Sequence, residues 1–323
     1  MTSPLEDGLF QGFSALDVAT ANVRFSGVVG GSGPPLLLLH GYPETHAAWH
    51  AVAPAFAASH TVVAPDLPGY GASELLRDSV WDKREVAAEL VAMMGRLGHE
   101  RFSVVAHDRG ARVGYRLALD HPPSVTAYAS LAVVPTLDIW PAVDREFANG
   151  AFHWFLFLQP GNLAERLLSS DPDAYLDETL RQMISPLEKL HWAALADYRA
   201  AFRKPSVRAA MIKDYRAGYG SDTENDAADR VAGRKLKCPV LVLWANERLV
   251  AEGVESDGAT VVDVWRRWAD EVSGFNVPGG HLIAEDAPGD VIRLVPPFLE
   301  VAENRRLDVE RTALRRPSNR SGS

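Results

Sequence analysis

Residues 104–112, VVAHDRGAR, place an aspartate between a β-branched run and a sequence that favours a helix. Asp108 stands in a small-x-Asp-x-small pattern, which is typical of the strand-to-helix turn that exposes a nucleophile above a sheet. Backbone N–H groups and the helix dipole stabilise an anion at such a helix start. An aspartate that only caps a helix is the alternative, but Gly110 and a downstream histidine favour a nucleophile.

An aspartate nucleophile indicates a particular chemistry. Its carboxylate can displace a leaving group from a saturated carbon and form an alkyl ester, which water then hydrolyses. An ether formed on a serine could not be hydrolysed in this way. Asp108 therefore predicts dehalogenation or epoxide opening rather than ordinary ester hydrolysis.

His281 lies on a glycine-rich loop just before the last predicted helix. A nucleophile first and a histidine last is the chain order of a large class of hydrolase triads. Because the usual pKa of histidine is near neutral, its side chain is suited to activating a hydrolytic water. We therefore predict that His281 is the general base, with an ordinary surface-loop histidine as the alternative.

The turn His40-Gly41-Tyr42-Pro43 follows the first strong predicted strand. Such a turn supplies a backbone N–H to an oxyanion hole. We predict the backbone N–H of Tyr42 as one donor and that of Arg109 as the second. His40 is expected to be structural.

Two arginines follow the predicted nucleophile, Arg109 directly and Arg112 four positions on. Guanidinium groups bind carboxylates bidentately and stay charged when partly buried. The formal net charge of −9 repels an anion from the molecule as a whole, so local positive groups must attract it. We predict that both arginines hold a substrate carboxylate; exposed surface charges are the alternative.

Three further residues carry ring N–H or O–H groups that can hydrogen-bond a departing halide. His153 and Trp154 occur in FHWFL, residues 152–156, and Tyr215 occurs in DYRAG, residues 214–218. A buried aromatic helix face explains the same pattern equally well, and both interpretations stay open.

The 323 residues, 47% of them hydrophobic, suit one large domain or a core with an inserted subdomain. No apolar run is long enough to span a bilayer, and residues 1–12 lack a secretory pattern. The single cysteine, Cys238, excludes an intrachain disulfide and is expected to be buried. The negative charge disfavours nucleic-acid binding. The expectation is a cytoplasmic protein without nucleic-acid or membrane partners.

Short apolar runs bounded by turn residues predict strands that are buried on both faces. These runs are 36–39, 62–64, 102–106, 130–134 and 240–244. Helix-like segments such as 81–97 and 112–121 lie between them. This alternation predicts an α/β fold with a mostly parallel sheet flanked by helices.

Residues 137–230 contain no clear strand run, and aromatic, leucine and charged residues recur there at helical spacing. We predict a helical cap over the carboxyl edge of the sheet, where open α/β sheets bind ligands. The expected organisation is a core segment, 1–136, the cap, 137–230, and a second core segment, 231–310. The polar tail, 311–323, is expected to be disordered.

From about residue 36 to residue 299, the chain resembles the fluoroacetate dehalogenases, the haloacid branch of the α/β-hydrolase superfamily. The shared motifs are HGYPETH (40–46), DLPGYG (66–71), HDRGAR (107–112), FHWF (152–155), QP (159–160), DYRAG (214–218) and GH (280–281). Epoxide hydrolases share the first two motifs, whereas HDRGAR together with the cap His-Trp pair is specific.

The resemblance implies an α/β-hydrolase fold, a homodimer, no cofactor and no metal. It implies hydrolytic dehalogenation of small 2-haloacids such as fluoroacetate, with a covalent ester intermediate and inversion at the reacting carbon. The implied roles are nucleophile for Asp108, base for His281, carboxylate binding for Arg109 and Arg112, and halide binding for His153, Trp154 and Tyr215.

The chain departs from the family at the acid that orients the base histidine. Ala132 stands where the family has this acid. The fold offers a second location for this acid, after the strand predicted over 240–244, and our hypothesis is that Glu247 orients His281 from there. That Glu247 is only a solvated loop carboxylate is an equal alternative. Asp138 is a weaker candidate for the acid. The cap is also slightly shorter around residues 182–186, which affects the entry tunnel.

Two alternatives to haloacid dehalogenation remain. An epoxide hydrolase or haloalkane dehalogenase of the same fold usually has tryptophan after the nucleophile and lacks paired arginines, although Tyr198, Tyr215 or Tyr219 can protonate an epoxide oxygen. A non-catalytic ligand-binding protein of this fold is the second alternative, and only Ala132 favours it.

Overall fold

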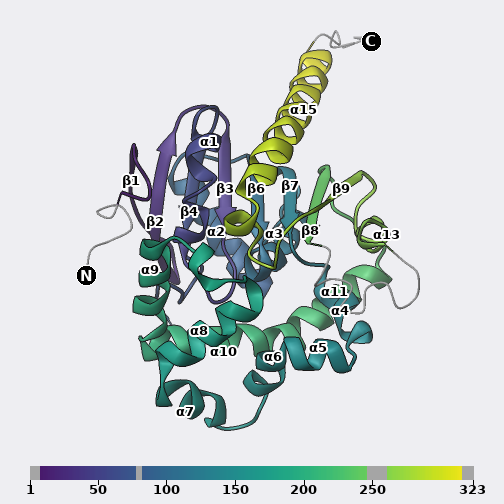
Figure 1. Cartoon of the computed structure of the whole chain (residues 1–323). Coiled ribbons are helices and arrows are strands. Elements are labelled where there is room, and N and C mark those ends of the chain that lie inside the picture. The colour runs from purple at the N-terminus through teal and green to yellow at the C-terminus, as the bar shows by residue number, and fades with distance from the viewer. Residues whose placement is uncertain (1–7, 78–81, 246–259, 315–323) are drawn as a thin grey trace, which may run out of the picture.

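The computed structural model describes residues 8–77, 82–245 and 260–314. Within these residues, a nine-stranded sheet forms the centre of the molecule (Figure 1). The strand order is β1-β2-β4-β3-β6-β7-β8-β9, and β5 pairs with β2. The bounds are β1 (Phe13–Ala19), β2 (Val23–Gly31), β3 (Pro35–Leu39), β4 (Thr61–Pro65), β5 (Glu74–Leu75), β6 (Phe102–His107), β7 (Val125–Leu131), β8 (Val240–Ala245) and β9 (Val272–Val277).

The sheet is parallel from β4 to β9, whereas β2 runs antiparallel to β1, β4 and β5. The leucine and valine side chains of β3, β4 and β6 are buried, as expected for strands covered on both faces. The register pairs Leu39 with Ala106, and His107 with Leu131. The loops after β3, β6 and β7 therefore emerge side by side at one edge.

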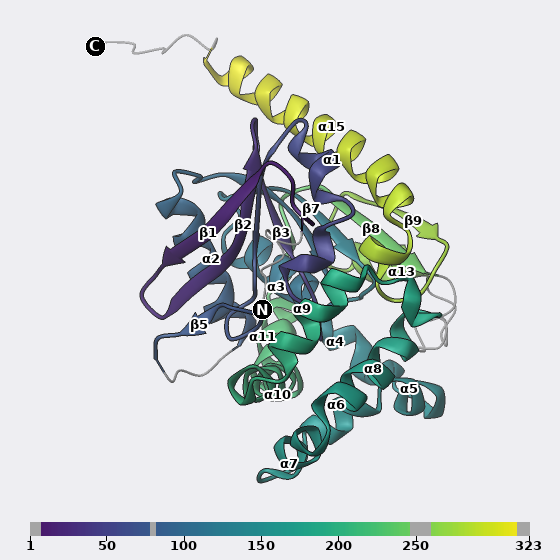
Figure 2. The same cartoon turned by 60° about the vertical axis from the view of Figure 1, so that its left-hand side comes forward.

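Helices cover both faces of the sheet (Figure 2). On one face α2 (Lys83–Arg96) packs against α3 (Asp108–Asp120), and on the other α1 (Ala53–Ala57) packs against α15 (Pro288–Leu314). The remaining core elements are η1 (His46–Trp49), α13 (Val261–Arg266) and α14 (Ile283–Asp286). This arrangement confirms the predicted fold class.

Between β7 and β8, where we expect a cap over 137–230, all elements are helices. They gather at the carboxyl edge of the sheet, on the side opposite the protruding end of α15 (Figure 1). They are α4 (Thr136–Ile139), η2 (Trp140–Ala142), α5 (Arg145–Gly150), α6 (Phe152–Phe157), α7 (Leu163–Ser170), α8 (Pro172–Met183), η3 (Leu187–Lys189), α9 (Trp192–Phe202), α10 (Pro205–Tyr219) and α11 (Ser221–Val231).

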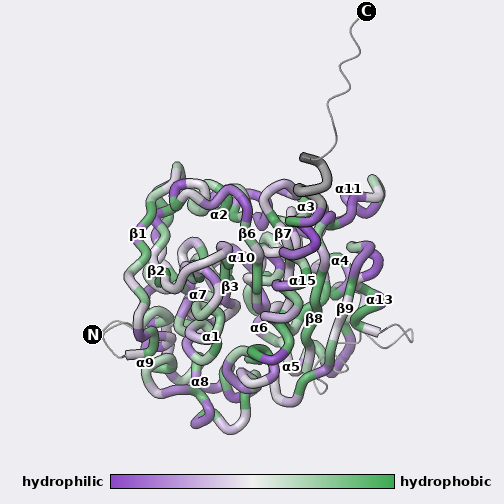
Figure 3. Tube along the Cα trace, turned by 90° about the horizontal axis from the view of Figure 1, so that it is seen from above, coloured by the Kyte–Doolittle hydropathy of each residue, from purple (hydrophilic) through white to green (hydrophobic). Residues whose placement is uncertain are grey.

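The core is built from the central strands and the helix faces that pack on them. The residues along β8 are mainly hydrophobic, whereas those of α11 are mainly hydrophilic (Figure 3). Trp265 and Trp268 are fully buried, and the Trp265 indole N–H donates to the Val133 carbonyl oxygen at 3.1 Å. Cys238 is buried as predicted, and burial raises the pKa of its thiol to about 12.

Several element boundaries differ from the sequence prediction. The strand predicted over 130–134 exists as β7 but lies earlier in the chain, because β7 ends at Leu131 and Ala132 adopts a positive φ of 67°. The helix predicted over 112–121 begins earlier, at Asp108 itself. The apolar-run criterion misses β1, β2 and β9, whose burial patterns are mixed.

The tail predicted as disordered from 311 is also partly wrong, since α15 continues to residue 314 and no glycine or proline interrupts the sequence there. Residues 315–323 lie outside the described part of the chain. Among the described residues, no helix combines the length and apolar character that a membrane span requires.

Candidate active site

Asp108 occupies the sharp turn between β6 and α3. Its φ of +46° is a left-handed conformation that is uncommon for a residue with a side chain. Two glycines allow neighbouring segments to approach this turn. A Cβ on Gly41 would lie 2.5 Å from the Asp108 Cβ, and a Cβ on Gly110 would lie 2.4 Å from the carbonyl oxygens of Leu39 and His40. The small residues of the motif are therefore required by close packing.

The carboxylate of Asp108 is buried and held from two sides. Its Oδ1 accepts the backbone N–H of Tyr42 at 2.9 Å, and its Oδ2 lies 3.4 Å from Nε2 of His281. Burial raises the pKa of Asp108, but the contact with His281 and the charges of His107 and Arg109 outweigh it and hold that pKa well below its usual range. Asp108 is therefore an anion at neutral pH, as a nucleophile must be.

The loop that carries His281 is attached to the cap. The His281 backbone N–H donates to the Met183 carbonyl oxygen at 2.8 Å, at the end of α8. The Gly280 N–H donates to Asp286 Oδ2 at 2.6 Å, and Asp286 Oδ1 lies 2.8 Å from Nζ of Lys189. A Cβ on Gly280 would lie 2.3 Å from the Met183 carbonyl oxygen. The glycine before the histidine therefore lets this loop pass directly under the cap.

A small cavity joins the two predicted catalytic residues to the cap. About 20 Å³ of it is open to the centre of a water-sized sphere, which is room for roughly one or two waters. Its lining residues are Asp108, Arg112, Val133, Ala151, His153, Trp154, Met183, Tyr215 and His281. Its walls combine the Asp108 carboxylate, the Arg112 guanidinium group and aromatic side chains, which suits a small polar molecule.

Arg109 is fully buried, and the cap binds most of its guanidinium group. Nε and Nη2 donate to the side-chain and backbone oxygens of Asp214 on α10, and Cζ lies 4.3 Å from the Tyr215 ring centroid. Asp214 also accepts a hydrogen bond from Tyr70 and pairs with Lys83. Although burial raises the pKa of Asp214, Arg109 and Lys83 lower it to about 2. Of the three guanidinium nitrogens of Arg109, Nη1 is the one that is buried without a hydrogen-bond partner among the described residues.

Arg112 lies on the cavity wall, one turn further along α3. Its Nη1 donates to the Val134 carbonyl oxygen and to Thr136 Oγ1, both at 3.1 Å. Its Nε is buried and, within the described part of the chain, has no hydrogen-bond partner. The Nε–Nη2 edge is one with which a guanidinium binds a carboxylate bidentately. Because Arg109 and Arg112 are both buried, the surface-charge alternative is wrong.

His153, Trp154 and Tyr215 converge on the cavity from α6 and α10. Nε2 of His153 lies 3.1 Å from the Tyr215 hydroxyl, and the His153 ring stacks on Tyr42 at a centroid distance of 5.0 Å. All three residues are buried. The two sequence interpretations are therefore compatible, since these residues form an aromatic face and also line the cavity with Asp108.

No carboxylate stands at the family's acid position. Ala132 is buried directly after β7, and its backbone N–H donates to the Leu243 carbonyl oxygen at 2.9 Å. Glu247, the residue we propose instead, lies outside the described residues. Asp138 is engaged elsewhere, because its carboxylate bonds to Arg230, Arg267 and Trp268.

Spacing predicts no role for several buried polar residues of the site. Glu44 Oε2 accepts the Gly41 N–H at 2.8 Å and lies 2.9 Å from His107 Nδ1. Glu44, His107 and Asp214 lie inside the sequence motifs shared with the fluoroacetate dehalogenases, and this location could have indicated that they belong to the site. Lys83 lies outside these motifs, and nothing in the sequence indicates its contact with Asp214. His40 is structural as predicted, since its Nε2 accepts the Leu67 N–H at 2.9 Å.

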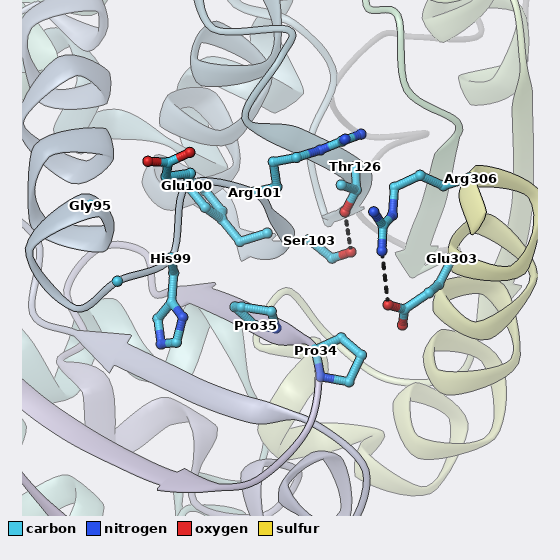
Figure 4. Close-up of a pocket in the computed structure, with 12 residues that line it drawn as sticks. Pro34, Pro35, Gly95, His99, Glu100, Arg101, Ser103, Thr126, Glu303 and Arg306 are labelled. Carbon is cyan, nitrogen blue, oxygen red and sulfur yellow. Dashed lines mark hydrogen bonds and ion pairs between the residues drawn. The ribbon is translucent and has the colours of Figure 1, made fainter. Parts of the chain in front are cut away.

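A larger cleft, of about 510 Å³, lies at the opposite, amino edge of the parallel strands. The Ser103–Thr126 hydroxyl pair and the Glu303–Arg306 ion pair border it, and Pro35 at the start of β3 lies between them and α2 (Figure 4). Open α/β sheets bind ligands at the carboxyl edge. The smaller cavity at Asp108 is therefore the candidate active site.

Comparisons with known proteins show which proteins this chain is similar to. Fluoroacetate dehalogenase from a Burkholderia species is 35% identical over 310 residues, which cover 92% of this chain and 97% of that protein. Soluble epoxide hydrolase from a Corynebacterium species is 31% identical over 279 residues, which cover 83% of this chain and 91% of that protein.

Among solved structures, a Pseudomonas aeruginosa protein provisionally named an epoxide hydrolase superposes with a TM-score of 0.87 at 48% identity, covering 91% of this chain and 98% of that one. A variant of it, with threonine replaced by aspartate, was solved with bound MFA. A family model described as the alpha/beta hydrolase fold matches residues 34–288. Since that match spans most of the sequence, the chain belongs to the α/β hydrolase fold family.

Proposed function

We propose that this protein hydrolyses the carbon–halogen bond of small 2-haloacids such as fluoroacetate and releases the 2-hydroxyacid. The observation that carries the proposal is the buried guanidinium group of Arg112, which lines the cavity with Asp108, together with the buried guanidinium group of Arg109, the next residue in the chain after Asp108. Nη1 of Arg109 and Nε of Arg112 have no hydrogen-bond partner among the described residues. Burying an unpartnered donor costs free energy, and a bound carboxylate removes that cost. The relative named fluoroacetate dehalogenase supports the same substrate class.

In the first step, Oδ2 of Asp108 attacks the carbon that bears the halogen. Oδ2 is the attacking atom because the Tyr42 N–H holds Oδ1. The carbon–halogen electron pair leaves with the halide, and an ester forms between Asp108 and the acid. His153 and Tyr215 line the same cavity, so their polar hydrogens can stabilise the departing halide.

In the second step, Nε2 of His281 removes a proton from water, and the water oxygen attacks Cγ of the ester. The Tyr42 N–H and the backbone N–H of Arg109, in the first turn of α3, stabilise the charge on Oδ1. The Cγ–Oδ2 bond then breaks, and the hydroxyacid oxygen takes the proton from His281. The new carboxyl group of Asp108 releases its proton and is an anion again.

Halide release tests the proposal. Wild-type protein is expected to release fluoride from fluoroacetate and chloride from chloroacetate, whereas Asp108→Asn is expected to lose at least about 10⁴-fold of both activities. Asp290→Asn, a carboxylate that pairs with Arg293 on the surface of α15, is the control and should match the wild type. A folded wild type that releases neither halide would exclude haloacid hydrolysis; chloride alone would retain the mechanism and exclude fluoroacetate.

Epoxide opening is the second candidate. The Tyr215 hydroxyl lines the cavity with Asp108, and burial raises its pKa well above the usual value, so it keeps the proton that an epoxide oxygen requires. Of the other tyrosines considered, Tyr219 is 61% exposed, and Tyr198 is absent from the cavity lining. Two results would together favour this function. The wild type would form a diol from an uncharged epoxide and Tyr215→Phe would not, and the wild type would release no halide from haloacids.

A further inference from the structure

His107 and Glu44 connect the three segments that hold the proposed reacting groups. Nδ1 of His107 lies 2.9 Å from Glu44 Oε2, and its Nε2 lies 2.8 Å from the backbone carbonyl oxygen of His281. Glu44 Oε2 also accepts the Gly41 N–H, next to the oxyanion donor. His107 itself directly precedes Asp108. One buried pair therefore joins the oxyanion loop, the nucleophile turn and the base loop.

The partners of His107 determine where its protons lie. A carbonyl oxygen only accepts hydrogen bonds, so Nε2 must carry a proton towards His281. An ionised carboxylate also only accepts, so Nδ1 must carry a proton towards Glu44. A neutral imidazole has one N–H, and only the imidazolium has two. Glu44 is suited to the ionised form because the same oxygen accepts both His107 and the Gly41 N–H.

We propose that His107 is a permanently charged imidazolium and a positioning residue, which, with Glu44 as its counter-ion, ties the base loop to the nucleophile turn. The proposal concerns the backbone of His281 rather than its ring. The His107 and His281 ring centroids are 5.0 Å apart, and the bond from His107 ends on the carbonyl oxygen. His107 therefore acts through His281 and does not need to touch the substrate.

The charged groups around this pair agree with the assignment. Burial lowers the pKa of His107, but Glu44 and then Asp108 raise it, and the net direction is upward. The pKa of Glu44 is lowered because His107, the Gly41 N–H and the nearby His40 outweigh its burial. A second buried glutamate, Glu285 on α14, has a pKa raised well above its usual value by burial and by the charge of Glu44. Glu44 is therefore the glutamate that carries the charge.

The connection through His107 is expected to affect the two steps of the reaction differently, and this expectation rests on the proposed function. Oδ2 of Asp108 and Nε2 of His281 are 3.4 Å apart, and the bond to the His281 carbonyl holds the loop that sets this distance. Only ester hydrolysis uses the base. Loss of the connection is therefore expected to slow ester hydrolysis more than ester formation.

Nitrogen NMR tests the charge without reference to activity. With ¹⁵N-labelled histidine, the wild type at about pH 8.5, two units above the usual histidine pKa, is expected to show a His107 signal with both ring nitrogens protonated, separate from any such signal of His46, whose pKa Asp66 raises despite its burial. The signal should be absent from the spectrum of His107→Gln, and its absence there would assign it to His107. A His107 ring that loses a proton near pH 6.5 would overturn the proposal.

Single-turnover kinetics with chloroacetate test the positioning role. In Glu44→Gln, ester formation on Asp108 is expected to stay within about threefold of the wild type, while ester hydrolysis slows by about 10- to 100-fold, as a misplacement of about 1 Å can cause. The matched control is Glu285→Gln, the same change at the neighbouring buried glutamate, which should hydrolyse the ester normally.

Two kinetic outcomes would overturn the proposal: normal ester hydrolysis in Glu44→Gln, or an equal loss in both variants. If Glu44→Gln does not fold, His107→Asn takes its place, because asparagine keeps a donor near Nδ1 and removes the bond to His281. If the wild type forms no ester, the proposed function fails, and the NMR result still decides the charge of His107.

Discussion

Arg109 and Arg112 carry the same charge but differ in their unbonded donors, and of the two only Arg112 is among the residues that line the cavity at Asp108. Asp214 binds Nε and Nη2 of Arg109, which leaves Nη1. Arg112 is anchored through Nη1 alone and keeps its Nε side. That both arginines hold a substrate carboxylate stays a prediction, but the two differ in the donors that they have left for it. Under the proposed function, Arg112 is therefore suited to the bidentate contact with the substrate carboxylate, whereas Arg109 offers its charge and the one unbonded nitrogen Nη1.

Replacing Arg112 by lysine tests this assignment. Lysine keeps the charge but cannot form the bidentate contact, and one lost charge-assisted hydrogen bond costs about 1.5–3 kcal/mol. Arg112→Lys is therefore expected to weaken glycolate binding by about 10- to 100-fold in calorimetric titrations. Arg116→Lys is the matched control, since Arg116 lies on the same helix and pairs with Asp226 and Asp229 instead. Equal losses in both variants would contradict the assignment.

At the scale of elements, the site depends on how closely α3 approaches the loop after β3. The pattern around Asp108 predicts the turn because its requirements are local: a strand end, small residues and a helix start. The exact helix start is not readable from apolar periodicity, since α3 begins at Asp108, while the first predicted helical residue is 112. The search for short apolar runs does not find the antiparallel strands β1 and β2, because their side chains are only partly buried.

A pair of glycine substitutions tests the packing of α3. Gly110→Ala would place its Cβ 2.4 Å from two carbonyl oxygens and is expected to destabilise the protein by about 3 kcal/mol. Gly95→Ala on α2 is the control, because nothing lies within 4 Å of its Cβ and alanine is about 0.5–1 kcal/mol better in a helix. Denaturant midpoints should therefore move in opposite directions. A tolerated Gly110→Ala would show that the turn has more room than described.

Across the whole molecule the net charge is −9, yet several buried charged side chains form ion pairs with groups of opposite charge. Lys83 lies between Asp214 and Asp222, and Arg116 lies between Asp226 and Asp229. Glu285 is the contrast, since burial and the nearby Glu44 raise its pKa well above the usual value. Neither of its carboxyl oxygens has a hydrogen-bond partner among the described residues, and Nδ1 of His50, whose own pKa burial lowers, lies 4.0 Å from Oε1.

This contrast predicts a pH-dependent effect on stability. As pH rises through about 4.5, Glu285 ionises in the unfolded chain while it stays protonated in the folded protein, so unfolding becomes more favourable. Glu285→Gln removes this effect and is expected to raise the melting temperature by about 2 °C or more at pH 7.5, and to leave it nearly unchanged at about pH 4. Glu188→Gln, an exposed glutamate, is the control. A lower melting temperature at pH 7.5 would exclude this explanation.

The layered α/β architecture and the turn that carries Asp108 can be predicted from the sequence, because hydrophobic runs and small residues act over a few neighbouring positions. The sequence also indicates the cap region and the glycine-rich loop of His281. Which donors of Arg109 are left without a partner depends on the three-dimensional fold, since Asp214 lies 105 positions away in the chain. The same holds for His107, whose partners are 63 and 174 positions distant. Hydrogen bonds depend on the positions of two atoms in space, and no local pattern records which distant acceptor the fold brings within 3 Å.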